Sequence, residues 1–421
     1  MNIGFIGLGK LGLPIALAIE SKGHNVCGYD INESVKEIIK NKKLDYKEKG
    51  AESLLKKSKI KFESIDYVVK NNDIIFVTIQ TPHQKEYEGI TRIPNDRMDF
   101  NYEYLKKGIK DLSDCIETNK INKTVIIVST VLPGTINRII KPILSSYVKL
   151  CYNPFFIAMG TTIDDFLNSE LILFGFDDND AADSAEKFYK TINNSTVYKT
   201  TIENAELIKV VYNTFISTKI SMINTIMETC HKLPNTNVDD VTQALSLCTN
   251  RIISNKYLKG GMGDGGGCHP RDNIALSWLA NKLNISYNWY DSIMKQREAQ
   301  TEWLAKLIIE NKFNSNEKIF ILGKCFKPET NLVIGSPSIL LKNILEELGE
   351  TVVIWDPYID EKVDFFVDEN NLNNKPSIFF IGTQHEYFKN FKFFPGSVVI
   401  DPFRYLKFNK DIKYIPIGKN V

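Results

Sequence analysis

Short apolar runs alternate with longer amphipathic stretches in the first 150 residues of the chain and again after residue 318. Because apolar side chains fill consecutive positions of these runs, we expect strands buried on both faces, which is typical of a parallel sheet covered by helices. The predicted strands are residues 2–6, 25–30, 73–78, 124–129, 318–322, 351–355, 377–381 and 397–400. Helices between them are predicted at 11–21 and 336–348.

The middle of the chain has a helical period instead. From residue 202 to 233 no Pro or Gly interrupts the pattern, which predicts one long helix ending before Pro234. Further helices are predicted at 238–246, 271–283 and 291–309, followed by a polar bridge at 311–318. The chain is therefore predicted to be α/β, then helical, then α/β again, with domains at 1–198, 199–310 and 311–421.

Length and charge narrow the class of protein. The 421 residues suffice for two or three domains at about 150 residues each. The formal net charge of +1 argues against a surface that coats nucleic acid. No apolar run reaches the ~18 residues of a membrane span, and no signal-peptide pattern opens the chain, so we expect a cytoplasmic protein without membrane partners.

The seven cysteines form no CxxC pair, so we expect neither a disulfide scaffold nor a structural metal site.

A glycine motif follows the first predicted strand and opens the first predicted helix. In GxGxxG, Gly7 allows a tight turn, Gly9 lets a pyrophosphate approach the backbone, and Gly12 lets helix and strand pack closely. Asp30 ends the second predicted strand, where a carboxylate accepts hydrogen bonds from a ribose and repels a 2′-phosphate. The motif predicts an NAD site whose loop contacts are Gly7, Gly9, Lys10, Leu11 and Gly12. The segment 4–10 also matches the start of a P-loop, but Leu11 offers no hydroxyl for Mg²⁺.

A second glycine-rich segment leads into Cys268. Pro270 suits the first turn of a helix, which places the thiol at a helix N-terminus, where the helix dipole favours the thiolate. Asp272 lies four residues further on, so both side chains face one pocket. A flexible linker ending at a buried thiol is the alternative. The other six cysteines stand in apolar or amphipathic runs and are expected to be small core residues.

Lys209 and Asn213 are four residues apart on the predicted long helix. A lysine among apolar neighbours usually extends to solvent, and for this pair alone we favour that interpretation. Paired with Asn213, it could instead stabilise a developing alkoxide.

Taken in order, these segments resemble the nucleotide-sugar dehydrogenase family over nearly the whole chain. The resemblance rests on GFIGLGKLG with Asp30, VSTVLPGT (128–135), NAELIKVVYNTFISTKISMIN (204–224), NRIISNKYL (250–258), GGGCHPRD (265–272), ILGKCFKPET (321–330) and SPSI (336–339). It implies two Rossmann-like, doubly wound parallel-sheet domains joined by a helical domain built on the long helix, which also forms the core of a homodimer.

The resemblance also implies chemistry. Such an enzyme oxidises the C6 hydroxymethyl of a nucleotide sugar, UDP-glucose by default, to a carboxylate with two NAD⁺. Cys268 then matches the thiol that forms a thiohemiacetal and a thioester, Lys209 and Asn213 the oxyanion-stabilising pair, and Asp272 a carboxylate assisting water or proton transfer. Thr130 matches a residue near the cofactor and the attacking water, and Arg251 an arginine that crosses to the partner's substrate. Further cofactor contacts are expected at Thr81 and Ser129, and substrate contacts at Phe156, Ile157, Tyr257, Gly265, Lys327 and Arg404.

The chain departs from the family pattern at several positions. Where the family has Asn-Pro-Glu-Phe-Leu-x-Glu-Gly, both carboxylates are missing, the first being replaced by Phe155. Asp264 and Gly267 replace the usual Phe and Ser before the cysteine, and Ile334-Gly335 replaces Arg-Glu. Two alternatives therefore stay open: a two-electron oxidoreductase that stops before thioester hydrolysis, and a non-catalytic dinucleotide-sensing protein.

Overall fold

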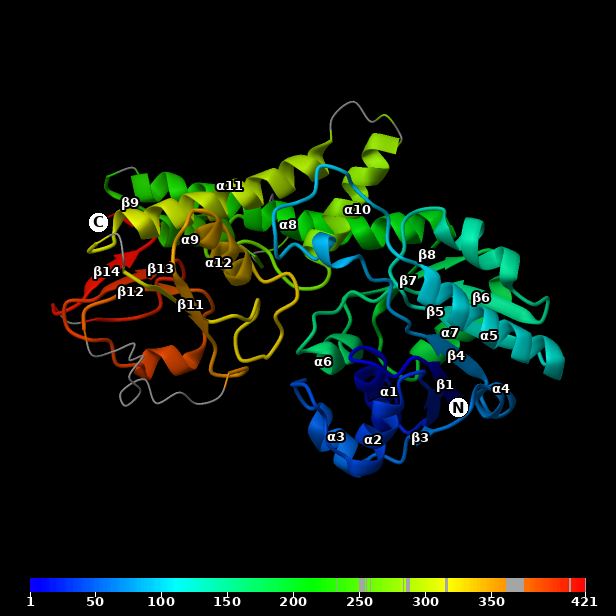
Figure 1. Ribbon diagram of the computed structural model, residues 1–421. Coiled ribbons are helices and arrows are strands. Elements are labelled where there is room, and N and C mark those ends of the chain that lie inside the picture. The colour runs from blue at the N-terminus through cyan, green and yellow to red at the C-terminus, as the bar shows by residue number, and fades with distance from the viewer. Residues whose placement is uncertain are drawn as a thin grey trace. The chain divides into compact units, whose positions relative to one another are not determined.

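The structure is a computed structural model (Figure 1). It describes residues 1–420 apart from 233, 250–253, 255, 258, 283, 285–287, 315, 316, 361–374 and 409. The chain forms two compact units. Unit 1 comprises residues 1–82 and 100–211, and unit 2 comprises residues 83–99 and 212–421.

Unit 1 is built on an eight-stranded sheet in the order β3-β2-β1-β4-β5-β6-β7-β8. All neighbours are parallel except β6 and β7. The strands are β1 (Asn2–Ile6), β2 (Asn25–Tyr29), β3 (Lys61–Phe62), β4 (Ile74–Val77), β5 (Lys123–Ile127), β6 (Val148–Tyr152), β7 (Leu171–Phe176) and β8 (Thr196–Thr200). The doubly wound parallel sheet predicted for this part is confirmed, and the order reverses between β1 and β4, where such sheets bind ligands.

The helices of unit 1 are α1 (Gly12–Ser21), α2 (Glu33–Asn41), α3 (Ala51–Lys57), α4 (Ile65–Asn71), α5 (Glu103–Asn119), α6 (Thr162–Leu167) and α7 (Asn179–Tyr189). A π-helical turn, η2 (Ile136–Ile140), and a 3₁₀ turn, η3 (Lys141–Ile143), follow β5. Helix α1 is buried over residues 12–19, because it packs against the sheet in the main apolar core of this unit.

Unit 2 contains a five-stranded parallel sheet in the order β11-β10-β12-β13-β14. Its strands are β10 (Ile319–Leu322), β11 (Val352–Trp355), β12 (Ile378–Ile381), β13 (Val398–Asp401) and β14 (Lys413–Pro416). Strands β10, β12 and β13 are buried throughout, and their side chains contribute to two apolar clusters. Helix α12 (Pro337–Glu347) is capped by Ser336, whose Oγ accepts hydrogen bonds from the backbone N–H groups of Ser338 and Ile339.

The central helices appear where the periodicity placed them. They are α8 (Ile202–Lys232), α9 (Val238–Ser246), α10 (His269–Lys282) and α11 (Trp289–Glu310). Helix α8 begins in unit 1 and continues into unit 2, since the division at residue 211 falls inside it. Helix α10 begins two residues before its predicted start, so that it includes His269 and Pro270.

The remaining short elements are the 3₁₀ turns η1 (Lys85–Tyr87) and η4 (Glu386–Asn390) and the strand pair β9 (Thr236–Asn237) and β15 (Lys419–Asn420). Among the described residues, no helix combines the length and the apolar character needed to cross a membrane.

Candidate active site

The glycine loop between β1 and α1 has the backbone geometry that its motif predicts. Gly7 has φ +98°, and a Cβ there would lie 2.9 Å from the backbone oxygen of Thr78. A Cβ on Gly12 would lie 2.2 Å from the backbone oxygen of Gly7, so helix and strand approach too closely for a side chain. At Gly9 nothing lies within 4 Å of an added Cβ, which leaves the backbone open to a ligand. The loop therefore fits a pyrophosphate at Gly9, with the exposed Lys10 and half-buried Leu11 beside it.

Asp30 stands at the end of β2, beside this loop. Its Oδ2 accepts a hydrogen bond from the backbone N–H of Leu8 at 2.7 Å, and its Oδ1 accepts one from Asn32 at 2.8 Å. The carboxylate is half-buried. A half-exposed carboxylate at this edge fits the ribose of a dinucleotide and disfavours a 2′-phosphate.

Three predicted cofactor residues meet beyond the carboxyl ends of β4 and β5. The hydroxyl of Thr81 donates a hydrogen bond to the backbone oxygen of Thr130 at 2.7 Å. The hydroxyl of Ser129 donates one to the backbone oxygen of Ile79 at 2.5 Å. Thr81 and Ser129 are buried, whereas Thr130 is half-buried. These bonds hold the two strand ends together on the ligand side of the sheet.

Glu206 on α8 fixes the loop that follows β5, and no motif in the sequence predicts this role. Its fully buried carboxylate accepts hydrogen bonds from the backbone N–H groups of Gly134 at 2.6 Å and Ile136 at 2.8 Å. Burial raises the pKa of Glu206 to about 7, although both hydrogen bonds act in the opposite direction.

Lys209 lies one turn after Glu206 and does not extend to solvent. Only 6% of its surface is exposed, and its ammonium lies over the ring of Phe156, 5.4 Å from the centroid. The interpretation favoured for the lysine from the sequence is therefore wrong. Phe156 and the neighbouring Ile157 are half-buried, which is consistent with their predicted place at a substrate.

Phe155, where the family pattern has glutamate, belongs to the apolar core of unit 1. It is 8% exposed and packs edge-on against Phe166, with ring centroids 5.4 Å apart. The residue is thus a packing residue, and its position offers no proton-transfer group.

Unit 2 brings Asn213 of α8 to Asp272 of α10. Nδ2 of Asn213 donates a hydrogen bond to Oδ2 of Asp272 at 2.5 Å, and Arg271 donates to Oδ1 at 3.0 Å. Asp272 is fully buried, and its backbone N–H donates to the oxygen of Cys268. Cys268 immediately precedes α10 and is half-buried, as predicted for a thiol at a helix N-terminus.

Among the other cysteines, the expectation of core positions holds in part. Cys27, Cys151, Cys230 and Cys325 are buried, whereas Cys115 is half-buried and Cys248 is exposed. For Cys248 the expectation is wrong, because this residue follows the end of α9.

A buried network that the sequence did not predict lies next to Cys268. Arg297 of α11 forms an ion pair with Asp264, with Nε 2.8 Å from Oδ1, and both side chains are almost fully buried. The Nε–H of Arg297 donates to the backbone oxygen of Asp264, so the contact with Oδ1 is an ion pair without hydrogen-bond geometry. Arg297 also donates to the backbone oxygens of Gly89 and Gly335. One guanidinium thus joins three segments, and the departures from the family pattern at 264 and 335 are the signal that could have indicated it.

His83 lies close to Arg271 and Asp272. Burial, followed by the positive charge of Arg271, lowers the pKa of His83 to about 4, while Asp272 acts in the opposite direction. The imidazole is therefore neutral near pH 7.

Three other predicted substrate residues of unit 2, Gly265, Tyr257 and Arg404, lie within the described residues. A Cβ on Gly265 would lie 2.6 Å from Cβ of Phe326, so glycine is required there, and Tyr257 is 45% exposed with φ +63°. Arg404 donates to Asp239, Gly260, Pro402 and Ile417. These bonds occupy its guanidinium, so its role in substrate binding stays a prediction. Arg251 lies outside the described residues.

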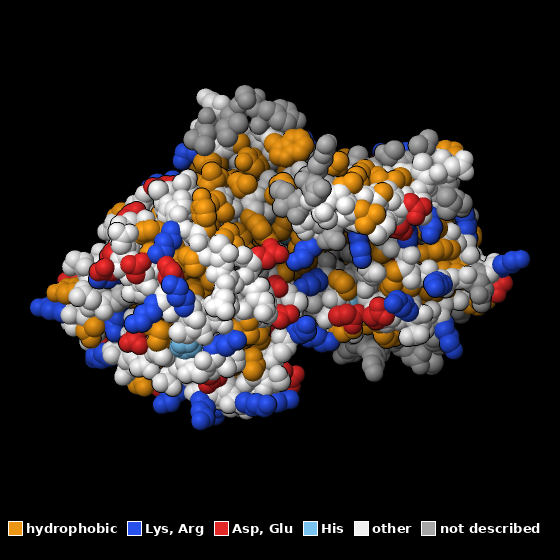
Figure 2. Space-filling view, turned by 180° about the vertical axis from the view of Figure 1, so that it is seen from behind, with side chains coloured by type: hydrophobic (Ala, Val, Ile, Leu, Met, Phe, Trp, Pro, Cys, Tyr) orange, Lys and Arg blue, Asp and Glu red, His pale blue; other side chains and the backbone are white. Residues whose placement is uncertain are grey.

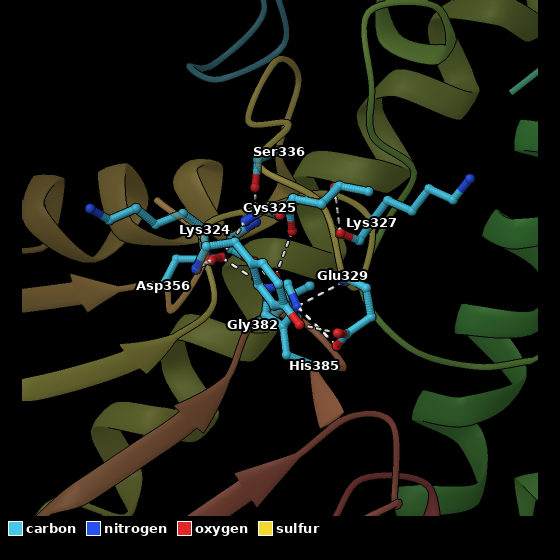
Figure 3. A network of polar contacts seen from close by, with 12 residues as sticks. Lys324, Cys325, Lys327, Glu329, Ser336, Asp356, Gly382 and His385 are labelled. Carbon is cyan, nitrogen blue, oxygen red and sulfur yellow. Dashed lines mark hydrogen bonds and ion pairs between the residues drawn. The ribbon is translucent and has the colours of Figure 1, made fainter. Parts of the chain in front are cut away.

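Lys327 is on the loop after β10, which a second network fixes (Figure 3). Oδ2 of Asp356 accepts hydrogen bonds from the backbone N–H groups of Lys324 and Cys325 at 2.7 and 3.0 Å. His385 Nε2 lies 3.1 Å from the same oxygen, and its Nδ1 accepts from the backbone N–H of Glu329 at 2.9 Å. In Figure 3 the side chain of Lys327 leads away from this cluster.

The same cluster is the one group of described residues whose spacing suits a metal ion, namely the buried Cys325, Asp356 and His385. However, Nδ1 of His385 accepts a hydrogen bond and therefore has no proton, so Nε2 carries the proton and donates it to Asp356. A metal at Nε2 would require the opposite tautomer. We conclude that the cluster is a hydrogen-bonded support for the loop.

The comparisons with known proteins agree with this geometry. Residues 1–193 match the NAD binding domain of the UDP-glucose/GDP-mannose dehydrogenase family, and residues 203–298 match its central domain. A UDP-glucose 6-dehydrogenase of Rickettsia prowazekii is 30% identical over 390 residues, covering 88% of this chain and 84% of that protein. The chain belongs to the UDP-glucose/GDP-mannose dehydrogenase family.

Other members are similarly related. A UDP-glucose 6-dehydrogenase of Bacillus subtilis is 28% identical over 387 residues, covering 87% of this chain and 80% of that protein. The structure of a UDP-glucose dehydrogenase from Pyrobaculum islandicum superposes with a TM-score of 0.85 at 24% identity, covering 99% and 98% of the two chains, and shares the fold.

The chain is thus an NAD-dependent nucleotide-sugar dehydrogenase, as the family and the glycine loop together establish. This result sets aside the non-catalytic alternative.

Proposed function

We propose that this dehydrogenase oxidises C6 of UDP-glucose to the uronic acid through a thiohemiacetal and a thioester on Cys268. The observation that carries the proposal is the thiol at the start of α10, with Asp272 one turn on and hydrogen-bonded to Asn213. The relatives named UDP-glucose 6-dehydrogenase support the choice of substrate. When bound at the glycine loop, NAD⁺ would accept a hydride from C6.

Each of the predicted site residues would then have its own role in the reaction. Lys209 is a buried cation and Asn213 a buried amide, so each can stabilise negative charge on the C6 oxygen. Cys268 would attack the C6 aldehyde and later leave as the thiolate. Asp272, held by Asn213 and Arg271, would keep the amide of Asn213 oriented and assist proton transfer in the oxidation steps. Thr130 would stand at the cofactor, and Gly265, Tyr257, Lys327 and Arg404 at the nucleotide sugar.

Purified protein incubated with NAD⁺ and a panel of UDP-, GDP- and dTDP-sugars tests the proposal. We expect absorbance to rise at 340 nm with UDP-glucose and the acid to form with two NADH per sugar. Cys268→Ser should abolish acid formation. If NAD⁺ is reduced only with another nucleotide sugar, that sugar replaces UDP-glucose as the proposed substrate. If no sugar leads to reduction of NAD⁺, the proposal is refuted.

A two-electron reaction is the second candidate, because Phe155 leaves no carboxylate at its position. It predicts one NADH per sugar and an aldehyde or ketone as the product. The ratio of NADH to product in the same assay distinguishes the two reactions.

We also propose a homodimer formed along α8, with Arg251 reaching the partner's site. Four apolar side chains of this helix, spaced by four, four and seven residues, are 38–61% exposed: Leu207, Val211, Phe215 and Met222. Such a stripe on one helix face is typical of an interface. Hydrophobic side chains also gather on the face shown in Figure 2, which is turned away from the viewer in Figure 1.

Light scattering after size-exclusion chromatography tests the dimer. Phe215→Lys should yield monomers, while Tyr104→Lys, at an exposed position on α5, should not. A monomeric wild-type protein would contradict the proposal.

A further inference from the structure

His269, the residue after Cys268, has its ring fixed against α8. Its Nδ1 lies 3.2 Å from Oγ of Ser217 and 3.3 Å from the backbone oxygen of Asn213. Ser217 is one turn beyond Asn213 on the same helix and is fully buried. The imidazole thus stands next to the turn of α8 that carries Asn213.

These contacts determine which nitrogen of His269 carries the proton. Ser217 has one hydroxyl proton and donates it to Oδ2 of Asp264 at 2.8 Å, and the oxygen of Asn213 can only accept. Nδ1 must therefore donate, so it carries the proton. Asn273 supports this assignment: its Nδ2 donates to Oγ of Ser217 at 3.0 Å and to the backbone oxygen of His269 at 2.9 Å, and that carbonyl fixes the orientation of the amide.

In the neutral ring, the other nitrogen then has a lone pair. No residue in the described part of the chain hydrogen-bonds Nε2 of His269, and the side chain is half-buried rather than enclosed. A neutral imidazole with Nδ1–H fixed by a serine and a carboxylate beyond it is the arrangement of a general base.

Asp272 is less suited to accept a proton from water. It is fully buried, and its two carboxylate oxygens accept hydrogen bonds from Asn213 and Arg271. Of the charged groups described above, Asp264 contacts Arg297, and His83, which lies close to Arg271 and Asp272, is neutral near pH 7.

We propose that Nε2 of His269 is the base that activates water for hydrolysis of the thioester on Cys268. The proposal rests on the proposed function, since it requires that thioester. The water oxygen attacks the thioester carbonyl carbon while one of its protons passes to Nε2. The tetrahedral intermediate then expels the sulfur of Cys268, so that the C–S bond breaks, the carboxylic acid forms, and His269 returns its proton to the thiolate or to solvent.

The experiment compares the wild-type protein with His269→Gln. His231→Gln is the matched control, because the ring of His231 contacts Trp303. NADH formation with UDP-glucose and NAD⁺ is followed by stopped flow, and the intact protein is analysed by mass spectrometry after an acid quench. For His269→Gln we expect a rapid burst of two NADH per site, then turnover slowed about a hundredfold or more. The quenched variant should carry an acyl adduct on Cys268, whereas the control should behave as wild type.

Each outcome decides the proposal. A full burst shows that His269→Gln is folded and reaches the thioester, so an accumulated adduct supports a role of His269 in hydrolysis. Loss of the ascending limb from the pH profile of the slow phase after the burst supports the same role. Wild-type turnover of His269→Gln, or a lost burst without adduct, would overturn the proposal. If the wild-type enzyme reduces NAD⁺ with no nucleotide sugar, the proposed function fails instead.

Discussion

Asn213 and Asp272 join α8 to α10 through a 2.5 Å hydrogen bond between two buried side chains that are 59 residues apart in the chain. The amide of Asn213 donates the hydrogen bond to the carboxylate of Asp272, and the carboxylate fixes the orientation of the amide. A candidate oxyanion-stabilising group and a candidate acid/base group are thus oriented by each other.

Asn213→Ala should destabilise the protein by about 1–3 kcal/mol, because Asp272 loses a donor while it stays buried. Urea unfolding measures the change. Asn204→Ala, at an exposed position near the start of the same helix, is the control and should cost less than about 0.5 kcal/mol. Equal effects of the two substitutions would show that the hydrogen bond contributes little.

Two glycines of the dinucleotide loop should respond differently to alanine. Gly12→Ala places a Cβ 2.2 Å from a backbone oxygen, so we expect about 1–3 kcal/mol or more of destabilisation. Gly9→Ala meets no atom within 4 Å and should leave unfolding nearly unchanged, while it weakens NADH binding tenfold or more by blocking the backbone. Chemical denaturation and fluorescence titration with NADH give the two quantities. Unchanged NADH affinity in Gly9→Ala would argue against the pyrophosphate at this position.

Acidification should destabilise the protein through His83. The unfolded imidazole binds its proton near pH 6.5, whereas the folded one does so only near pH 4. Between these values the unfolded state binds more protons, so this contribution to stability is complete above pH 6.5 and is lost as the pH falls toward 4. The shift corresponds to about 3 kcal/mol.

Urea midpoints between pH 7 and pH 4 test this expectation. The loss of stability should be smaller in His83→Gln than in wild type, and Gln84→Ala, which removes no titrating group, should keep the wild-type slope. A His83→Gln protein with an unchanged slope would contradict the assignment.

Phe155→Glu should not restore the missing carboxylate in a functional form. The side chain packs in an apolar core beside Phe166, so a glutamate there would be buried without a partner. We expect a loss of about 3–5 kcal/mol, against about 1–2 kcal/mol for Phe155→Leu, from denaturation curves. Faster turnover with wild-type stability would show that the position reaches the site after all.

The sequence by itself determined the features that depend on neighbouring residues. The roles of Gly7 and Gly12 follow from the tight turn between a strand and a helix, and the length of α8 follows from a run without Pro or Gly. Cys268 could be placed at a helix N-terminus because Pro270 is two residues away. These features are local, so the chain around each residue suffices to predict them.

Tertiary structure decided the contacts between distant segments. Lys209 lies over Phe156 instead of reaching water, Arg297 pairs with Asp264, and Ser217 fixes the proton of His269. The contacts of Lys209 and Ser217 have no sequence pattern, because each depends on which faces of separate elements pack together. For Arg297 the sequence offers only the unusual residues at 264 and 335. The sequence indicated the candidate nucleophile and the glycine loop, and packing determined the partners of the buried polar groups, since a buried donor or acceptor must find its partner wherever the fold places one.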